Sequence, residues 1–401
     1  MNSEPLAQLA ETHIHFLCEE IPTRQVGSTG NQAATQYFAN TMAQNGFKVE
    51  RQTFDCIDMR QGEIELTANG HSFQASISPY SLGCNIRAEL VKVETVEELE
   101  GLDIKDKLLL LTGEITHEQL MPKNFVFYNP EHHQQIYQLL EEKQPAAIIA
   151  ATSRNPELAG GLYPFPLFED GDFDIPSAYL KDIEGEKLAE FTGREVHLKM
   201  DAERIPSRAE NVSAQRGDQN GKIVVCAHID AKAGTPGALD NAGGTTVLML
   251  LADLMKDYGD NLGIEILAFN GEDYYSAGGQ MEYLHRHSTD LNQIRLVINL
   301  DGVGYHKTPT GISFYDCPQT VQDAATQLIS EFGEFEEMPQ WFQGDHMVFV
   351  SQGIPAIAFT TAEFADVWID IAHTREDTPD KVDGVILAET AKFIFELIKR
   401  I

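Results

Sequence analysis

Imidazole and carboxylate side chains follow several short apolar runs in the second half of this chain. His228 and Asp301 each come directly after such a run, and the pair Glu272–Asp273 comes a few residues after a third. Asp240 and His373 lie in loops of the same half. Mixed nitrogen and oxygen ligands of this kind suit two divalent metal ions of hard to borderline character. The pattern therefore predicts a metal-dependent hydrolase.

The apolar runs are the elements that must position these side chains. Each run is short and continuous, which is typical of a strand buried on both faces. The predicted strands are 223–227, 264–269, 296–300 and 356–359, and the predicted helices are 243–255 and 385–399. Strands that alternate with helices indicate an α/β fold, with a mixed, mostly parallel sheet flanked by helices. In such sheets ligands gather beyond the carboxyl ends of the strands, so we expect the candidate ligands to meet at one edge.

The middle of the chain has a different pattern and none of these candidate ligands. Two amphipathic helices open the chain. Short strands then flank the turn Asn69–Gly70, and further apolar runs at 107–112 and 146–151 are typical of buried strands. We predict a catalytic domain of residues 1–60 and 207–401 and an inserted, smaller α+β or β domain of residues 61–206.

Composition narrows the class of partner. The net charge of −33 argues against nucleic acid and anionic membranes, which are bound by clustered Lys and Arg. No apolar stretch approaches the length that spans a bilayer, and the first residues have no basic start followed by an apolar core. The five cysteines are widely spaced and odd in number, which fits a reducing compartment. We expect a cytoplasmic protein.

The roles of some candidates follow from what a hydrolytic two-metal centre needs. Asp240 is a candidate for the bridging carboxylate, and the glycines in its loop 237–244 would let the backbone approach the metals. Asp230, two residues after His228, is a candidate to accept the second N–H of that imidazole and to fix its tautomer. The adjacent pair Glu272–Asp273 cannot share one role, so we expect one to bind metal and the other to transfer protons.

Five segments of the chain resemble, in order and spacing, the motifs of M28-family zinc aminopeptidases. They are His228–Asp230, Leu239–Gly244, Asn270–Asp273, Asn299–Asp301 and His373–Thr378. The resemblance implies a fold of the zinc-exopeptidase type, two zinc ions and peptide substrates with a free N-terminus, whose α-amine would coordinate one ion. The insert resembles a protease-associated domain, mainly in the runs 107–110 and 146–149.

The same resemblance implies which residues bind each ion. It implies that His228, Asp240 and Asp301 hold one zinc ion. Asp273 and His373 would hold the second ion together with the shared Asp240, and cobalt or manganese would be possible substitutes.

The resemblance also implies that Glu272 is the general base that activates water for attack on the peptide. One position departs from the family, which usually has Glu where this chain has Asp273. Because the aspartate is one methylene shorter, we expect the second ion to shift, to bind less tightly, or to be a metal other than zinc.

Other functions fit the same scaffold. They are a glutaminyl-cyclase-like acyltransferase with a single zinc ion, a carboxypeptidase, and a noncatalytic binding protein. The full set of five ligands weighs against the first and the last. The pair Asp345–His346 fits either a pocket-lining or a structural role. The pair His132–His133 of the insert is expected on the surface, because neighbours on a helix do not face one direction.

Overall fold

The structure is a computed structural model, and it describes residues 4–21, 23–155, 163–259, 262–273 and 275–401. The chain divides into a larger unit, residues 1–56 and 208–401, and an inserted unit, residues 57–207. The boundaries predicted from sequence are 60/61 and 206/207. The two units are described separately below.

Helices of the larger unit come from both ends of the chain. They are α1 (Glu4–His15), α2 (Thr29–Gln44), α6 (Gly243–Leu254), α7 (Gly278–Arg286), α8 (Gln319–Phe332), α9 (His346–Val350), α10 (Phe364–Asp370) and α11 (Gly384–Arg400). Local chemistry sets several of the ends. The Ser28 hydroxyl accepts the N–H of Asn31 at the start of α2, and the Asp383 carboxylate accepts the N–H of Val385 at the start of α11. α8 ends at Gly333, which takes the left-handed conformation.

The sheet of the larger unit is mixed and mostly parallel. Its strands are β9 (Asp218–His228), β10 (Leu262–Phe269), β11 (Ile294–Leu300), β12 (Thr310–Tyr315), β13 (Phe335–Glu337), β14 (Ala356–Thr361) and the last part of β8 (Glu195–Arg216). They are ordered β13-β12-β14-β11-β9-β10-β8. The neighbours from β14 to β10 pair in parallel, while β12 and β8 pair antiparallel to β14 and β10. This arrangement confirms the fold class predicted from sequence.

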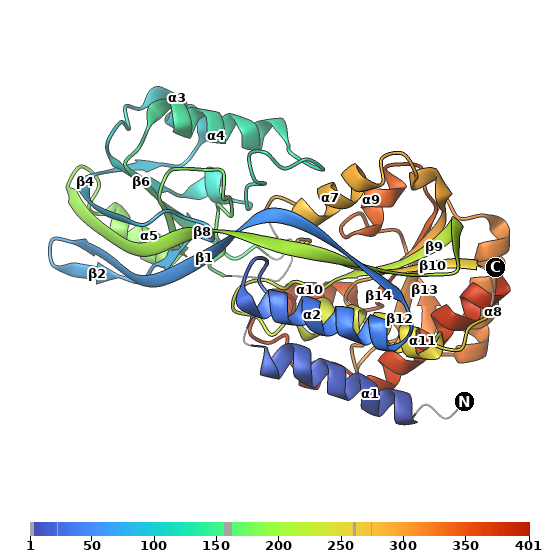
Figure 1. Ribbon diagram of the computed structural model, residues 1–401. Coiled ribbons are helices and arrows are strands. Elements are labelled where there is room, and N and C mark those ends of the chain that lie inside the picture. Colours follow the sequence, from blue (N-terminus) through green and yellow to red (C-terminus); the bar gives the residue numbers. More distant parts are fainter. Residues whose placement is uncertain (1–3, 22, 156–162, 260–261, 274) are drawn as a thin grey trace. The chain divides into compact units, whose positions relative to one another are not determined.

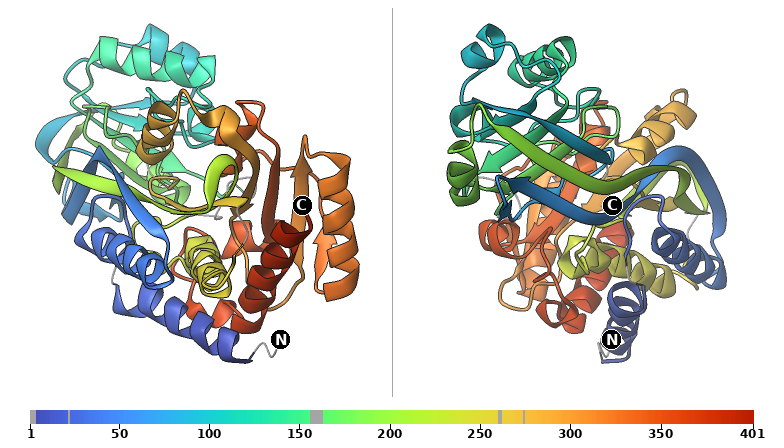
Figure 2. Two further views of the ribbon diagram at one scale, coloured as in Figure 1. Left: turned by 45° about the vertical axis from the view of Figure 1, so that its right-hand side comes forward. Right: turned by 90° about the vertical axis from the view of Figure 1, so that its left-hand side faces the viewer.

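Both faces of this sheet are covered, which explains the continuous apolar runs. Along β9, Ile223, Val225 and Ala227 pack into one core with α1, α2, α6 and α11, whereas Val224 and Cys226 pack into the core on the other face. Figure 1 shows α1 and α2 on one side of the sheet and α7 and α9 on the other. Figure 2 shows α6, in yellow, beside the red α11 and the blue α1. α6 is buried along most of its length because other helices surround it.

The inserted unit is built around parallel strands with antiparallel pairs at its edges. Its elements are the end of β1 (Lys48–Ala68), β2 (His71–Phe73), β3 (Ser76–Ile77), β4 (Cys84–Val93), α3 (Val96–Gly101), β5 (Leu108–Leu111), α4 (Glu131–Lys143), β6 (Ala147–Thr152), β7 (Ser177–Lys181), α5 (Asp182–Ala189) and the start of β8. β4, β5, β6 and β7 pair in parallel, and β3 and β8 pair antiparallel to β7 and β4. The predicted turn Asn69–Gly70 joins β1 to β2, and both turn residues have positive φ angles.

Within the part of the chain that the structure describes, no helix is both long enough and apolar enough to cross a membrane.

His13 is a buried titratable group in α1, away from the sheet edge where the candidate ligands lie. Its Nδ1 lies 2.7 Å from the hydroxyl of Tyr37. Burial lowers the pKa of His13 to about 4, against an opposing effect of Asp253. The unfolded chain takes up this proton near the usual pKa of about 6.5. Between about pH 6.5 and 4 the unfolded state therefore binds more protons, and stability falls as the pH falls.

We predict that His13→Gln reduces the pH dependence of stability, because the amide can accept the Tyr37 hydroxyl but does not titrate. From pH 7 to pH 5, the free energy of unfolding should fall by about 2 kcal/mol less in the variant than in the wild type. Urea unfolding at several pH values measures this difference. The exposed His15 provides a control in His15→Gln. Parallel pH profiles for wild type and His13→Gln would contradict the prediction.

Candidate metal centre

The five predicted ligands meet at one edge of the sheet in the larger unit. His228 is the last residue of β9, and Asp301 follows the last residue of β11. Asp273 lies in the loop after β10, Asp240 lies in the turn η3 (Ala238–Ala242) before α6, and His373 lies in the loop after α10. Because β9, β10 and β11 are parallel neighbours, their carboxyl ends lie at the same edge. The parallel sheet therefore places residues that are far apart in sequence side by side.

The ligand atoms form two groups that share Asp240. In one group, His228 Nε2 lies 3.1 Å from Asp240 Oδ1 and 3.6 Å from Asp301 Oδ1. In the other, His373 Nε2 lies 2.9 Å from both Asp240 Oδ2 and Asp273 Oδ1. Within each group, all ligand atoms lie within 4.8 Å of one another. The two oxygens of Asp240 thus face different histidines, which is the arrangement of a bridging carboxylate.

The buried ligand atoms of this cluster are better placed to bind a common cation than to form hydrogen bonds with one another. His228, Asp240 and Asp301 are at most 3% exposed. Within the described ranges, several of the cluster's buried polar atoms have no hydrogen-bond partner. They are Nδ1 and Nε2 of His228, both carboxylate oxygens of Asp240, Oδ2 of Asp273 and Oδ1 of Asp301. Buried polar atoms are almost always paired, so atoms that converge without bonding indicate a missing common partner. Imidazole nitrogens and carboxylate oxygens are ligands that zinc accepts.

The electrostatics of the cluster also favour added positive charge. Burial alone would lower the pKa of His228, yet Asp230, Asp240 and Asp301 raise that pKa well above its usual value. The same balance of burial against carboxylates raises the pKa of His373. Burial opposes ionisation of Asp240, but the two histidines lower its pKa. The carboxylates therefore favour protonation of both imidazoles. Divalent cations would supply the same positive charge.

Glu272 lies beside this cluster in the loop after β10, and it is partly exposed. Burial of its carboxyl group raises the pKa of Glu272 well above the usual value, and nearby Asp273, Asp301 and Asp345 act in the same direction, although His228 opposes them. A carboxyl group with a raised pKa next to metal ligands has the properties of a group that takes up and releases a proton.

Asp230 lies next to His228 but bonds mainly to the neighbouring loop. Its Oδ1 accepts the N–H of Gly271 at 2.7 Å, and its Oδ2 accepts the N–H of Asp273 at 3.0 Å. The distance from Asp230 Oδ1 to His228 Nδ1 is 3.7 Å, which is longer than a hydrogen bond. The predicted contact is therefore electrostatic at this distance. The two backbone bonds give Asp230 an additional role that the sequence did not indicate, because they fix the loop that carries Glu272 and Asp273.

The glycines after Asp240 allow a close contact between two segments of backbone. A Cβ on Gly243 would lie 2.5 Å from the carbonyl oxygen of Val303, and one on Gly244 would lie 2.7 Å from that of Leu300. These glycines let the start of α6 pack against the backbone after β11. The expectation that the glycines of this loop let the backbone approach the metal ions stays a prediction.

Asp345 and His346 are neighbours in sequence, and Asp345 lies near enough to the centre to interact with His228 and Asp301. Asp345 is 2% exposed, and its Oδ1 accepts a hydrogen bond of 2.9 Å from the Gln280 side chain. Burial raises the pKa of Asp345 to about 7, while His228 lowers it. His346 is fully buried, and its Nε2 lies 3.1 Å from the carbonyl oxygen of Trp341. Of the two roles left open from sequence, this burial and bonding support the structural one for His346.

A third His and Glu cluster, in the inserted unit, does not fit a metal. Nε2 of His132 and of His133 lie 2.8 and 3.0 Å from the same oxygen of Glu118. Nδ1 of His133 accepts the N–H of Met121 at 3.1 Å, so in the neutral ring the proton is on Nε2. A metal ion on Nε2 would require that proton to leave and the ring to become anionic. A hydrogen bond to Glu118 explains the geometry without this step.

This cluster corrects the expectation for His133, whereas His132 lies on the surface as predicted. The two rings do face a common partner, with centroids 4.3 Å apart, and His133 is buried. They lie in the first turn of α4, where Glu118 from an earlier part of the chain reaches both Nε2 atoms. Helical spacing describes where side chains leave the backbone, but long rings can still converge on one acceptor.

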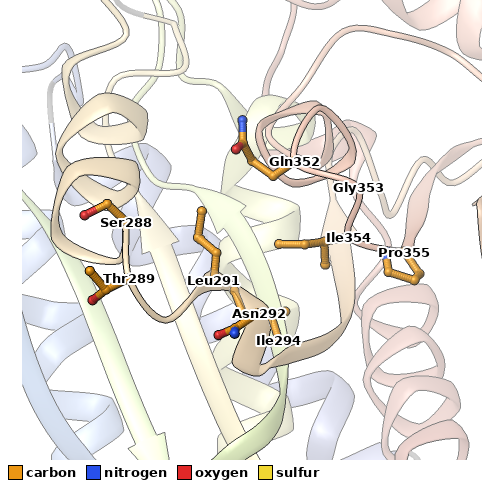
Figure 3. A pocket seen from close by; sticks show the side chains of 9 residues that line it. All are labelled: Ser288, Thr289, Leu291, Asn292, Ile294, Gln352, Gly353, Ile354 and Pro355. Atoms are coloured by element: carbon orange, nitrogen blue, oxygen red, sulfur yellow. The ribbon is translucent and has the colours of Figure 1, made fainter.

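A pocket of about 560 Å³ lies elsewhere in the larger unit (Figure 3). Its lining includes Ile294, the first residue of β11, whereas Asp301 follows the last residue of that strand. The pocket therefore lies at the opposite end of β11 from the candidate ligands. It is lined by small polar and apolar residues, including Ser288, Gln352 and Ile354, and has no acid or base among its lining residues.

Several residues that shape the site carried no clear signal in the sequence. Gln280 holds Asp345, and Trp368 packs edge-on against His373 with ring centroids 5.7 Å apart. Arg24 and Asp377 hold the loop before Asp240 by backbone bonds. Asp377 lies within the motif that begins at His373, so its position could have been singled out. Arg24 bonds to main-chain carbonyls, which sequence does not reveal.

The chain is similar to a peptidase family and to several aminopeptidases. Residues 211–398 match the model of peptidase family M28. The chain is 22% identical over 423 residues to aminopeptidase YwaD of Bacillus subtilis (strain 168), covering 98% of this chain and 85% of that protein. It is 27% identical over 194 residues to a probable leucine aminopeptidase 2 of Aspergillus oryzae (strain ATCC 42149 / RIB 40), which is 44% of this chain and 38% of that protein. The matched part thus spans less than half of the Aspergillus protein.

The solved structure of a zinc aminopeptidase from Bacillus subtilis aligns with a TM-score of 0.75. The two chains are 19% identical, and the alignment covers 98% of this chain and 94% of that one. The similarity shows that the fold is shared.

We predict that zinc raises the thermal unfolding midpoint of the protein and that Asp240→Asn largely removes this effect. At a free zinc concentration of 100 times the dissociation constant, binding should stabilise the wild type by about 2.7 kcal/mol. Differential scanning calorimetry with zinc and with a chelator measures the shift. The exposed Asp323 provides a control in Asp323→Asn. A wild type that zinc does not stabilise, or an Asp240→Asn variant stabilised equally, would contradict the assignment of these ligands.

Proposed function

Because residues 211–398 belong to peptidase family M28, we propose that this chain is a metal-dependent aminopeptidase, an exopeptidase that removes N-terminal residues from peptides. The observation that carries the proposal is the geometry of Asp240. Its two oxygens lie 3.1 Å from His228 Nε2 and 2.9 Å from His373 Nε2, so one carboxylate serves two histidines. A single-ion enzyme would not need this second group, which weighs against the glutaminyl-cyclase-like alternative.

Two zinc ions are the proposed cofactor. His228, Asp240 and Asp301 would hold one ion, and Asp240, Asp273 and His373 would hold the other. Bound there, the ions would polarise the scissile carbonyl and make water a stronger nucleophile near neutral pH. The Asp273 carboxylate reaches His373 Nε2 at 2.9 Å despite its short side chain, which supports a complete second site. Cobalt and manganese are the proposed substitutes for zinc.

The protein's own groups carry out the proton transfers. We assign Glu272 as the general base, because it is the carboxylate of this loop that is not in either ligand group and it is partly exposed. Its carboxylate takes a proton from the attacking water and later gives that proton to the nitrogen of the leaving amine. Asp230 keeps Glu272 in place through its bonds to Gly271 and Asp273. Proton transfer by a positioned carboxylate contributes about 10²–10⁴-fold in rate.

Access to the centre is from the side of His373. The side chain of His373 is 17% exposed, whereas those of His228, Asp240, Asp273 and Asp301 are at most 4% exposed. A peptide can therefore approach the second ligand group, while the first is covered by protein. We propose that the substrate's free α-amine binds at this side, which would restrict cleavage to the N-terminal residue.

The inserted unit has no assigned part in this chemistry. We propose that residues 57–207 are an insert of the protease-associated type within a catalytic domain formed by the larger unit. The runs that resemble such a domain form β5 and β6, two fully buried strands of this unit.

We predict that Glu272→Gln keeps both metal ions but lowers kcat by at least 10²-fold, because the amide cannot accept the proton. Turnover of an aminoacyl 4-nitroanilide and zinc content per chain should be measured on the same preparation. Glu336→Gln, at an exposed position of β13, is the matched control and should leave both quantities unchanged. Wild-type turnover in Glu272→Gln would rule out this residue as the base.

We also predict that acetylation of the substrate's N-terminus abolishes hydrolysis, since the acetylated nitrogen is neither charged nor able to coordinate. Matched peptides with free and acetylated N-termini should be compared by mass spectrometry of the products. Cleavage of both peptides at similar rates would exclude an aminopeptidase, and removal of C-terminal residues would indicate a carboxypeptidase instead.

A further inference from the structure

Asp377 binds the loop that carries Asp240 through consecutive backbone groups. Its Oδ1 accepts the N–H of Leu239 at 2.7 Å, and its Oδ2 accepts the N–H of Asp240 at 3.0 Å. Its own carbonyl oxygen accepts the N–H of Ala238 at 3.2 Å. Asp377 is fully buried. Three successive N–H groups of the Asp240 loop therefore bond to one residue.

Arg24 binds the preceding part of the same loop, but through carbonyl oxygens instead of N–H groups. Its guanidinium donates to the carbonyl oxygens of Pro236 at 2.8 Å and Gly237 at 2.7 Å. Two further bonds, to the carbonyl oxygens of Leu17 and Ile229, fix the guanidinium itself. The planar group with its several donors suits this arrangement, whereas a lysine offers one compact ammonium.

The backbone between these two contacts leaves no room for a side chain. Gly237 has a φ of +62°, and a Cβ there would lie 2.7 Å from Arg24 and 2.6 Å from the carbonyl oxygen of Asp240. The loop is thus held by a cation on its carbonyl groups and by an anion on its N–H groups. Both contacts act within four residues of Asp240, the residue shared by the two ligand groups.

We propose that Asp377 and Arg24 are positioning residues that hold Asp240 as the bridging ligand and thereby set the affinity of the metal centre. The proposal rests on the two-ion site of the proposed function. Asp377 also follows His373 by four residues in the same loop, so it joins the segments that carry two ligands of one ion. Displacement of the Asp240 loop relative to His373 would separate ligands that now lie 2.9 Å apart.

Asp377→Asn tests the carboxylate with almost no change in volume. An amide has one acceptor oxygen, and its NH₂ group would face a backbone N–H, so at least one bond is lost. Loss of such an outer partner typically costs about 10–100-fold in metal affinity. A residue that only fills space would tolerate this substitution. We therefore expect Asp377→Asn to bind zinc about 10–100-fold more weakly than the wild type.

The experiment measures zinc dissociation constants by competition with a chromophoric chelator, and zinc release rates, for the full chain. The visible absorption of the cobalt-substituted protein gives an independent signature of ligand geometry, and it should change in Asp377→Asn. Asp380→Asn, in the same loop but with a side chain 70% exposed, is the matched control. Circular dichroism of the metal-free proteins shows whether each variant folds.

The outcomes are distinct. Wild-type protein that binds no zinc would contradict the proposed function. If the wild type binds zinc and a folded Asp377→Asn binds it equally well, with the same cobalt spectrum, the positioning role is wrong. If Asp377→Asn does not fold, Arg24→Lys decides. We expect it to bind zinc at least threefold more weakly, and affinity equal to that of the wild type would overturn the proposal.

Discussion

The site depends on the burial of several carboxylates within a few ångströms of one another. Asp240, Asp273 and Asp301 lie at one sheet edge with two imidazoles, and all three carboxylates are nearly inaccessible to solvent. Like charges in a poorly solvated place are costly unless cations balance them. The raised pKa values of His228 and His373 show that the carboxylates favour positive charge on these imidazoles. A fold retains such a cluster at the expense of stability, which is typical of a functional centre.

Hydrogen bonds, and not regular secondary structure, hold the loops at this edge in position. Two buried carboxylates, Asp230 and Asp377, each accept two backbone N–H groups of a loop that carries ligands. Asp230 fixes the segment with Glu272 and Asp273. His373 has a φ of +59°, a conformation that non-glycine residues rarely adopt and that the surrounding loop must hold. The parallel strands bring the loops together, and these bonds set their final positions.

The sequence predicted the coarse architecture because burial on both faces leaves a clear pattern. The runs of β9, β10, β11 and β14 were recognisable as strands, and their parallel pairing follows from the alternating helices. The residues that follow these strands can therefore be grouped at one sheet edge from sequence alone. Chemistry carried by side chains at regular positions is the part of a site that sequence reveals best.

Contacts between side chains and the main chain were not predictable. Every residue has the same backbone groups, so the sequence does not show which of them a side chain binds. Arg24 bonds to carbonyl oxygens, so no partner in the sequence could identify it. The glycines after Asp240 allow a close helix–strand contact, which their motif alone did not distinguish from a ligand contact. His132 and His133 converge on Glu118 through the reach of their rings. In each case the contact depends on tertiary geometry, which the sequence does not reveal.

Anomalous diffraction from crystals grown with zinc would locate the ions without reference to activity, and so tests whether Asp240 bridges two of them. We expect two peaks about 3.5–4 Å apart, one beside His228 and the other beside His373, with Asp240 between them. A single peak, or zinc bound elsewhere with this cluster empty, would contradict this expectation.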